Sequence, residues 1–306
     1  MTTIPRLEFH EDKSLADIKM VCADFIMKIG YSPLSSIGED NVTYNTILSE
    51  FASFNMEEKL FRKICLEAST IAELCYSGTS AEVRVFIARY SWYFLYIDDY
   101  CQRHTDRLAT FQQGVFSYMI SEDKVLNDLR RCLADAYRLW DDIPANGITV
   151  SGLESVNGCL IEKLLCGMPI SPDAGRWPDF LRLKTGAGHA YAYMIFPKEL
   201  GVEVATYIQA VDDIALFICL TNNILSFYKE ELAGETGNYI HLRATVTHKC
   251  PLDALKDTVK DTLDAHERIL KVLANTPAYE PFKEFVNGSM GLHHVLSRYL
   301  LADLRL

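Results

Sequence analysis

The sequence has few of the features that mark membrane, secreted or disordered proteins. No apolar run reaches the about 18 residues that a membrane-spanning helix needs, and only 16 glycines and 10 prolines occur among 306 residues. The nine cysteines form no CxxC pair, and their odd number and apolar surroundings indicate reduced thiols within a core. The first residues, MTTIPRLEFHEDKSLAD, carry charges where a signal peptide would be apolar. We therefore expect a compact, soluble, cytoplasmic protein without stable membrane insertion.

Positive charge is also scarce. The 30 lysines and arginines are outnumbered by 41 aspartates and glutamates, which gives a net charge of -11. Because surfaces that bind nucleic acids or anionic membranes are generally basic, no nucleic-acid partner is expected. The acidic balance does not exclude an anion bound at one local site, particularly through metal ions.

Apolar residues recur at helical spacing along most of the chain, and alternating strand-like runs are few. This periodicity predicts one all-α domain over residues 1–306. Turn residues at Asp142–Gly147 predict a loop there. Helices are expected near residues 15–29, 56–76, 81–104, 122–140, 152–166, 200–231, 252–274 and 279–303. Residues 91–99, 212–230 and 286–300 are apolar on nearly all sides, which indicates helices inside a bundle, where ligand sites are commonly built.

Three oxygen-bearing side chains follow one another at intervals of four residues. Asn222, Ser226 and Glu230 would share one face of a helix. Since Mg2+ prefers about six hard oxygen ligands, part of them from water and phosphate, this spacing is typical of a magnesium site. Lys229 is placed to meet a phosphate. The alternative is a solvated helix end with ordinary polar residues.

A second acidic pair ends an aromatic segment. Asp98 and Asp99 close the run SWYFLYIDDY, and adjacent carboxylates at the end of an apolar helix require water or a cation. An exposed helix end is again the alternative. The similar pairs Asp141–Asp142 and Asp212–Asp213 are set aside, because the first precedes a proline turn and the second does not share a helix face with Asn222.

Two arginines lie where they could bind phosphate. Arg182 precedes Gly186 and Gly188, which suggests a helix interrupted where backbone groups face a ligand. Arg298 and Tyr299 follow an apolar helix near the end of the chain. Taken alone, each arginine fits an ordinary surface position better than a phosphate site. Two metal sites, two arginines and a lysine around an apolar helical core together indicate removal of diphosphate from an apolar substrate.

These motifs resemble those of class I terpene synthases, and most closely the fungal trichodiene synthase family. The resemblance runs from about residue 90 to residue 303 and depends on four segments in the family's order, IDDYCQ, PDFLRLKTGAGH, NNILSFYKEE and HHVLSRY. It implies a single-domain helical bundle with a central cavity. Residues 1–80 add little to it beyond helical character.

The resemblance assigns a role to each motif residue. Asp98 would bridge two Mg2+ ions, and a third ion would be chelated by Asn222, Ser226 and Glu230. Diphosphate would be bound by Arg182, Lys229, Arg298 and Tyr299, and Gly186 would mark the helix break. Two features depart from the family pattern. Gln102 and Arg103 stand where a further acid is usual, and Asn223 stands where aspartate is common.

The implied activity is Mg2+-dependent conversion of farnesyl diphosphate to a sesquiterpene, with a macrocycle of the α-humulene type as the product hypothesis. Residues one and two turns deeper on the faces that carry Asp98, Asn222 and Arg298 would line the cavity, or else be ordinary core. They are Phe94, Leu95, Ser91, Ile218, Cys219, Ala215, His294, Gly291 and Met290. A chain-elongating prenyltransferase and an inactive helical scaffold remain alternatives. The family often dimerises, so a homodimer stays open.

Overall fold

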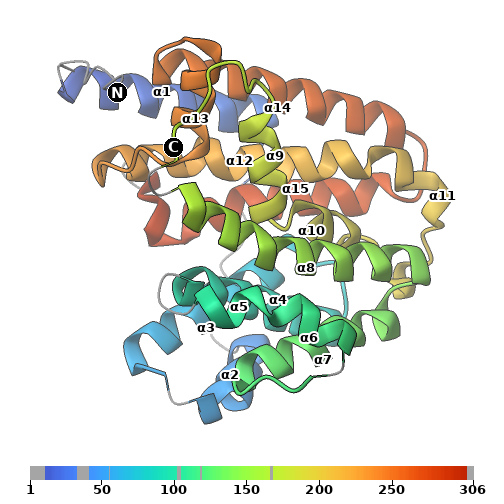
Figure 1. The fold of residues 1–306 in the computed structure, drawn as a ribbon. Helices are drawn as coiled ribbons and strands as arrows, with labels where there is room; N and C mark the ends of the chain where they lie inside the picture. Colours follow the sequence, from blue (N-terminus) through green and yellow to red (C-terminus); the bar gives the residue numbers. More distant parts are fainter. Residues whose placement is uncertain are drawn as a thin grey trace.

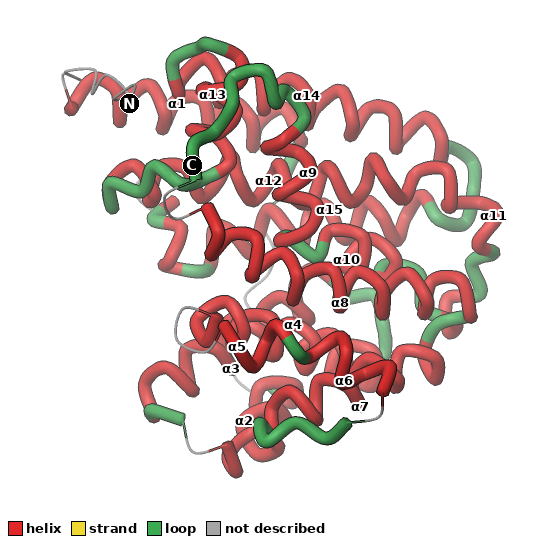
Figure 2. The backbone as a smooth tube through the Cα atoms, viewed as in Figure 1, coloured by secondary structure: helices red, strands yellow, loops and turns green. Residues whose placement is uncertain are grey.

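The computed structural model describes residues 11–32, 41–54, 56–101, 105–117, 119–165 and 168–301. These residues form helices joined by loops, with no strand among them (Figures 1 and 2). The prediction of an all-α fold is confirmed. The α-helices are α1 (Glu11–Ile29), α2 (Val42–Phe51), α3 (Glu58–Cys75), α4 (Ala81–Cys101), α5 (Thr105–Ala109), α6 (Phe111–Ser117), α7 (Lys124–Leu139), α8 (Asp142–Leu165), α9 (Trp177–Thr185), α10 (Gly188–Met194), α11 (Val204–Tyr207), α12 (Val211–Leu232), α13 (Tyr239–Thr247), α14 (Pro251–Leu273) and α15 (Tyr279–Val295). The 3₁₀ helices are η1 (Ala52–Phe54), η2 (Lys198–Leu200), η3 (Ile208–Ala210) and η4 (Ser297–Tyr299).

Helix α12 lies at the centre of the bundle. It packs against α14 on one side and α10 on another, and it also contacts α1, α9 and η4 (Figure 1). Most of its side chains are buried, as expected for a helix that is apolar on nearly all sides. The stretch Val204–Leu232 is long and apolar enough to cross a bilayer by length and composition, but such a helix is equally typical of a protein core.

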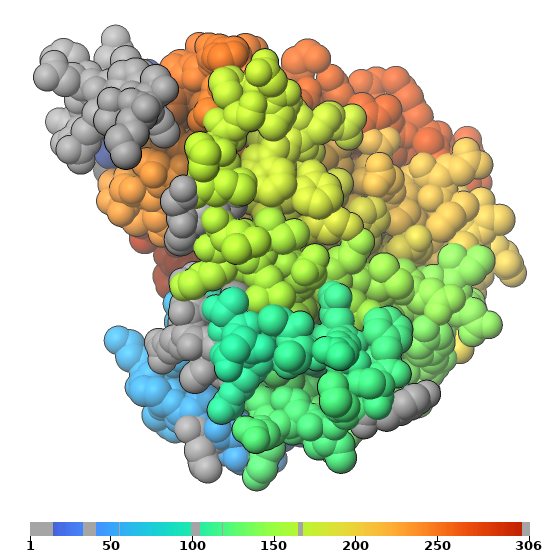
Figure 3. Space-filling view, in the orientation of Figure 1, coloured from blue at the N-terminus to red at the C-terminus, as the bar shows by residue number. Residues whose placement is uncertain are grey.

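Helices α4 and α12 carry the predicted metal ligands and are connected through two others. Helix α4 packs on α8, α8 packs on α10, and α10 packs on α12. Side chains of α8 and α9 cover the middle of the face seen in the space-filling view (Figure 3). The residues predicted to bind metal are therefore carried by helices that lie far apart along the chain.

The loop predicted at Asp142–Gly147 is wrong, because these residues form the first turns of α8. Pro144 is the third residue of the helix, where a missing backbone N–H breaks no helical hydrogen bond. Gly147 does not form a turn, and its lack of a side chain instead allows close helix packing. A Cβ atom at this position would lie 2.2 Å from the ring of Tyr193, so the glycine lets α8 and α10 approach closely.

Helix α15 ends at Val295, earlier than the periodicity predicts. Leu296 is extended, the single turn η4 follows, and Leu300 adopts a left-handed conformation with φ 56°. This change of direction turns Arg298 and Tyr299 out of the helical path. Upstream, Gly288 lets α15 approach α3 so closely that a Cβ atom there would lie 1.9 Å from the carbonyl oxygen of Leu74.

Candidate active site

The three oxygen donors predicted to chelate a metal all lie within the uninterrupted helix α12. Steps of four residues therefore place Asn222, Ser226 and Glu230 along one face. Ser226 is buried, and the other two are partly buried. The Lys229 Nζ atom lies 3.9 Å from a carboxylate oxygen of Glu230, and both side chains are mostly shielded from solvent.

Asn222 is hydrogen-bonded to both of the other predicted diphosphate-binding segments. The Nη2 atom of Arg182 donates to its Oδ1 atom at 2.9 Å, and its Nδ2 atom donates to the hydroxyl oxygen of Tyr299 at 3.1 Å. Helices α9 and α12 and the turn η4 thus meet at one amide group. The burial of the Tyr299 hydroxyl raises its pKa, so it stays protonated and can donate to an anion.

Arg298 is held by an acidic residue that the sequence did not single out. Its Nη1 atom donates to Oε2 of Glu67, in α3, at 2.6 Å. The Glu67 side chain is only 8% exposed, whereas that of Arg298 is 35% exposed. Burial by itself lowers the pKa of Arg298, but Tyr299, Glu67 and Asp98 outweigh it, so the net pKa lies above its ordinary value.

Asp98, at the end of α4, lies opposite α8. Its carboxylate, the carboxylate of Glu162 and the thiol of Cys159 are within 4.8 Å of one another. Surrounding protein atoms desolvate the Glu162 carboxyl group and raise its pKa, and the charge of Asp98 raises it further, while Arg182 opposes both effects. Arg182 lowers the pKa of Glu162, and Asp98 raises the pKa of Arg298, so each acid is near enough to one of the two arginines to act on its charge. The side chain of Asp99, together with Gln102 and Arg103, lies outside the described residues.

The predicted helix break follows Arg182. Helix α9 ends at Thr185, the Gly186 N–H donates to the Arg182 carbonyl oxygen at 2.9 Å, and Ala187 takes a left-handed conformation with φ 49°. Gly186 and Gly188 lie against α12, because a Cβ atom on either would come within 2.7 Å of Cys219 Sγ. The residue in the strained conformation is thus alanine, while the two glycines allow close packing.

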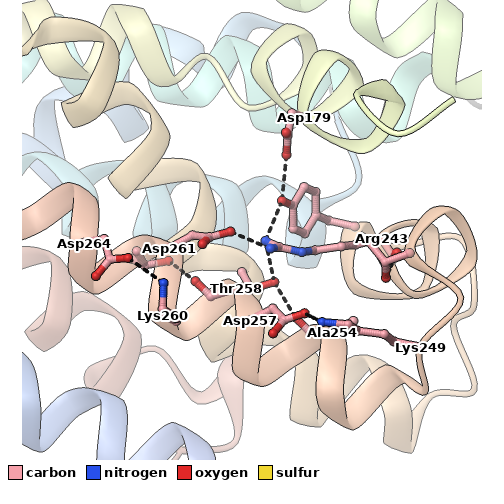
Figure 4. A network of polar contacts seen from close by, with 12 residues as sticks. Asp179, Arg243, Lys249, Ala254, Asp257, Thr258, Lys260, Asp261 and Asp264 are labelled. Carbon is pink, nitrogen blue, oxygen red and sulfur yellow. Dashed lines mark hydrogen bonds and ion pairs between the residues drawn. The ribbon is translucent and has the colours of Figure 1, made fainter.

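A polar network connects α9 to α13 and α14 (Figure 4). The Tyr239 hydroxyl donates to Asp179 at 2.8 Å, and Arg243 joins this pair to α14 through Thr258 and Asp261. Asp179 lies three residues before Arg182, hence on nearly the same side of α9. The network therefore fixes the helix that carries Arg182.

Most of the predicted cavity-lining residues lie in the interior, but they differ in their contacts. Ser91 is buried and accepts a hydrogen bond from Tyr191 at 3.1 Å, and Phe94 packs on Tyr90 with ring centroids 4.5 Å apart. Cys219 and Ala215 lie beneath the helix break. His294 is exposed, and its neighbour His293 is the histidine that faces the core. The remaining residues are partly or fully buried, namely Leu95, Ile218, Met290 and Gly291.

A family model described as trichodiene synthase (TRI5) matches residues 52–305. This chain belongs to the trichodiene synthase family of class I terpene synthases. Terpene synthase BipA from Cochliobolus sativus is 33% identical over 237 residues, which cover 76% of this chain and 73% of the relative. An (E)-beta farnesene synthase from Metarhizium brunneum is 30% identical over 292 residues, which cover 92% of this chain and 87% of the relative.

The fold of this terpene synthase also matches a solved structure. Linalool/nerolidol synthase from Streptomyces clavuligerus, in complex with 2-fluorogeranyl diphosphate, superposes with a TM-score of 0.61 over 85% of this chain and 99% of the other. Only 12% of the aligned residues are identical, so the likeness concerns the all-α terpenoid synthase fold. The all-α terpenoid synthase fold expected from the resemblance is confirmed.

Divalent metal use is general in this family, and the donors of this terpene synthase fit such an ion. Amide, hydroxyl and carboxylate oxygens along α12 are hard ligands, and the exposed carboxylates of Asp98 and Glu162 lie close enough to share one cation. The Cys159 thiol is a soft ligand and does not suit magnesium.

Sequence reasoning missed Glu162 and Glu67. Each is a single acidic residue within an apolar stretch of a helix, a pattern that does not distinguish it from an ordinary surface residue. Their positions opposite Asp98 and Arg298 arise from helix packing alone.

Proposed function

We propose that this terpene synthase is a Mg2+-dependent sesquiterpene synthase that ionises farnesyl diphosphate and releases diphosphate. The observation that carries the proposal is the meeting of Arg182, Asn222 and Tyr299 through two hydrogen bonds, from segments 40 and 77 residues apart. A structural scaffold has no need for an arginine, an amide and a phenol to converge beside a row of oxygen donors.

In this proposal Asp98 would hold two magnesium ions, and Asn222, Ser226 and Glu230 would hold a third. Bound there, the ions would neutralise the negative charge of the leaving diphosphate. Hydrogen bonds to the diphosphate oxygens would come from the Tyr299 hydroxyl and from three basic residues, Arg182, Lys229 and Arg298.

The apolar side chains below the charged residues would surround the hydrocarbon chain of the substrate. Phe94, Leu95, Ile218 and Met290 exclude water, which would otherwise trap the allylic cation. The ring of Phe94 presents a π face that attracts a cation by about 1–2 kcal/mol when desolvated. The helix break at Gly186 lies against α12 and close to Arg182, so it would respond to movement of Arg182.

Farnesyl diphosphate is the proposed substrate because of the similarity to the (E)-beta farnesene synthase. The geranyl analogue bound in the structurally similar synthase makes the C10 substrate the necessary comparison. A macrocycle of the α-humulene type is the proposed product. The proposal further includes one catalytic domain and a cytoplasmic location, and light scattering of the purified protein would distinguish a monomer from a homodimer.

The test is incubation of the purified protein with C10, C15 and C20 prenyl diphosphates and Mg2+, with gas chromatography of volatiles and measurement of released diphosphate. We expect volatile product from the C15 substrate and none after chelation of the metal. Consumption of added isopentenyl diphosphate would instead identify a chain-elongating prenyltransferase, and a folded protein that releases no diphosphate from any donor would be a scaffold.

Two variants test the metal ligands. Asn222→Ala and Glu230→Ala should each abolish Mg2+-dependent diphosphate release. The exposed residues Asn157 and Glu267 offer matched controls, and Asn157→Ala and Glu267→Ala should retain full activity. Retained activity in both metal-site variants would refute the assignment.

A further inference from the structure

Helix α3 contains a buried carboxylate that serves neither as a helix cap nor as a proposed metal ligand. Among the described residues, the acidic side chains in the buried class are Glu67 and Asp123, and Asp123 caps α7. A buried charge is costly unless a partner neutralises it. Glu67 finds that partner 231 residues along the chain, in Arg298 at 2.6 Å. Lys63 is farther away, at 4.0 Å and mostly exposed.

The two partners lie at different depths. Glu67 is 8% exposed and Arg298 is 35% exposed, so the carboxylate lies on the inner side of the guanidinium. A guanidinium carries five N–H groups in a rigid plane, and the hydrogen bond to Glu67 uses one of them, on Nη1. An acceptor on the inner side fixes the plane while the outer edge stays accessible to an anion.

The surrounding packing keeps this geometry rigid. Gly288 of α15 touches the backbone of α3 at Leu74, two turns beyond Glu67, so the two helices cannot slide apart without losing this contact. After Leu296 the chain enters η4, where Tyr299 is hydrogen-bonded to Asn222 and its ring lies tilted against that of His293, with centroids 4.4 Å apart. Arg298 is thus held from below by α3 and from the side by its own turn.

We propose that Glu67 is a positioning residue, which orients the Arg298 guanidinium so that its outer N–H groups bind the diphosphate of the substrate. This inference rests on the proposed function. It assigns a role in the reaction to a residue that lies outside the four sequence motifs of the family, in α3. Orientation before binding saves the cost of ordering a long side chain when the anion arrives.

The test compares two substitutions at Glu67 with a matched control on the same helix. Glu67→Ala removes the acceptor, and Glu67→Gln keeps an acceptor oxygen but removes the charge. Glu73→Gln is the control, because Glu73 lies six residues later on α3 and pairs with Arg84, at 3.2 Å, instead of with Arg298. Circular dichroism and thermal unfolding establish that each variant is folded.

The first readout is calorimetric binding of inorganic diphosphate in the presence of Mg2+, and the second is the separate measurement of kcat and KM. We expect Glu67→Ala to weaken diphosphate binding about tenfold and to lower kcat/KM by a similar factor, which corresponds to about 1.4 kcal/mol for the lost orientation. Glu67→Gln should recover part of the loss. Glu73→Gln should remain within twofold of the wild type.

A double-mutant cycle tests whether Glu67 acts through Arg298. In an Arg298→Gln background, Glu67→Gln should cause no further loss of diphosphate binding. Additive losses would overturn the inference, as would tighter binding in Glu67→Gln, because the carboxylate would then be a competitor of the diphosphate. If Glu67→Ala does not fold, Glu67→Gln and the cycle still decide. A wild-type protein that neither binds nor releases diphosphate would refute the proposed function itself.

Discussion

Loss of the hydrogen bond between Arg182 and Asn222 is expected to strengthen metal binding but to weaken diphosphate binding. The Asn222 Oδ1 atom accepts from Arg182 at 2.9 Å, and the same oxygen is the proposed metal ligand. A metal ion at about 2.1 Å from this oxygen would lie beside the guanidinium charge, so the ion has to displace Arg182. Loading of this site would then release Arg182 towards the diphosphate.

The magnitude follows from the bond that is broken. A hydrogen bond to a charged group contributes about 1.5–3 kcal/mol, so its removal should strengthen metal binding about 10- to 100-fold. In the absence of diphosphate, Arg182→Gln should therefore bind Mn2+, a spectroscopic substitute for Mg2+, more tightly than the wild type. With Mg2+ present, the same variant should bind diphosphate more weakly.

The assay is electron paramagnetic resonance of free Mn2+ during titration, followed by calorimetry with diphosphate. Arg298→Gln is the control, because it removes the same charge from the site without a hydrogen bond to Asn222. Equal gains in both variants would show that charge alone is responsible, and unchanged or weaker Mn2+ binding in Arg182→Gln would refute the reasoning.

Three further predictions concern packing, pH and the network around α9. Gly288→Ala forces a Cβ atom to within 1.9 Å of the Leu74 carbonyl oxygen and should lower the free energy of unfolding, measured in urea, by about 1–3 kcal/mol. The control is Gly237→Ala, which has open space around it and should change this free energy little. Burial lowers the pKa of His293 to about 4, below its ordinary 6.5. As the pH falls, the unfolded state therefore takes up a proton before the folded state does. The free energy of unfolding should fall by about 3 kcal/mol between pH 6.5 and 4. His293→Phe should make this dependence on pH weaker, and an unchanged dependence would contradict the reasoning. Tyr239→Phe removes the hydroxyl between Asp179 and Arg243 and should lower kcat/KM about tenfold, because α9 becomes less firmly held. The control is Tyr137→Phe, which removes an exposed hydroxyl that donates to Asn146 and should leave kcat/KM unchanged. Equal effects of the two substitutions would argue against a role of Tyr239 in positioning Arg182.

Local sequence information predicted the elements that depend on local interactions. The face of α12 with Asn222, Ser226 and Glu230 was readable because helix geometry converts a spacing of four residues into neighbouring side chains. The apolar character of residues 212–230 predicted a central helix for the same reason, since a helix without a polar face has to be buried. The break after Arg182 was also predictable, because two nearby glycines interrupt a helical pattern.

Errors arose where packing between distant segments outweighed a local signal. Pro144 and Gly147 were read as a turn, yet they belong to α8, because a proline in the first turn costs no hydrogen bond and the glycine admits the ring of Tyr193. The end of α15 was placed too late, because its periodicity continues beyond Val295 while the chain turns away to place Tyr299 against Asn222.

The sequence by itself determined the helical class, the family and the row of oxygen donors on α12. These follow from spacings along one chain segment. Only the tertiary structure decided which acids face the basic residues. Glu162 meets Asp98 from α8, and Glu67 holds Arg298 from α3, 231 residues away. The physical reason is that electrostatic interactions depend on the distance between two charges in space. Helix packing sets this distance, and the number of residues between the two charges does not predict it.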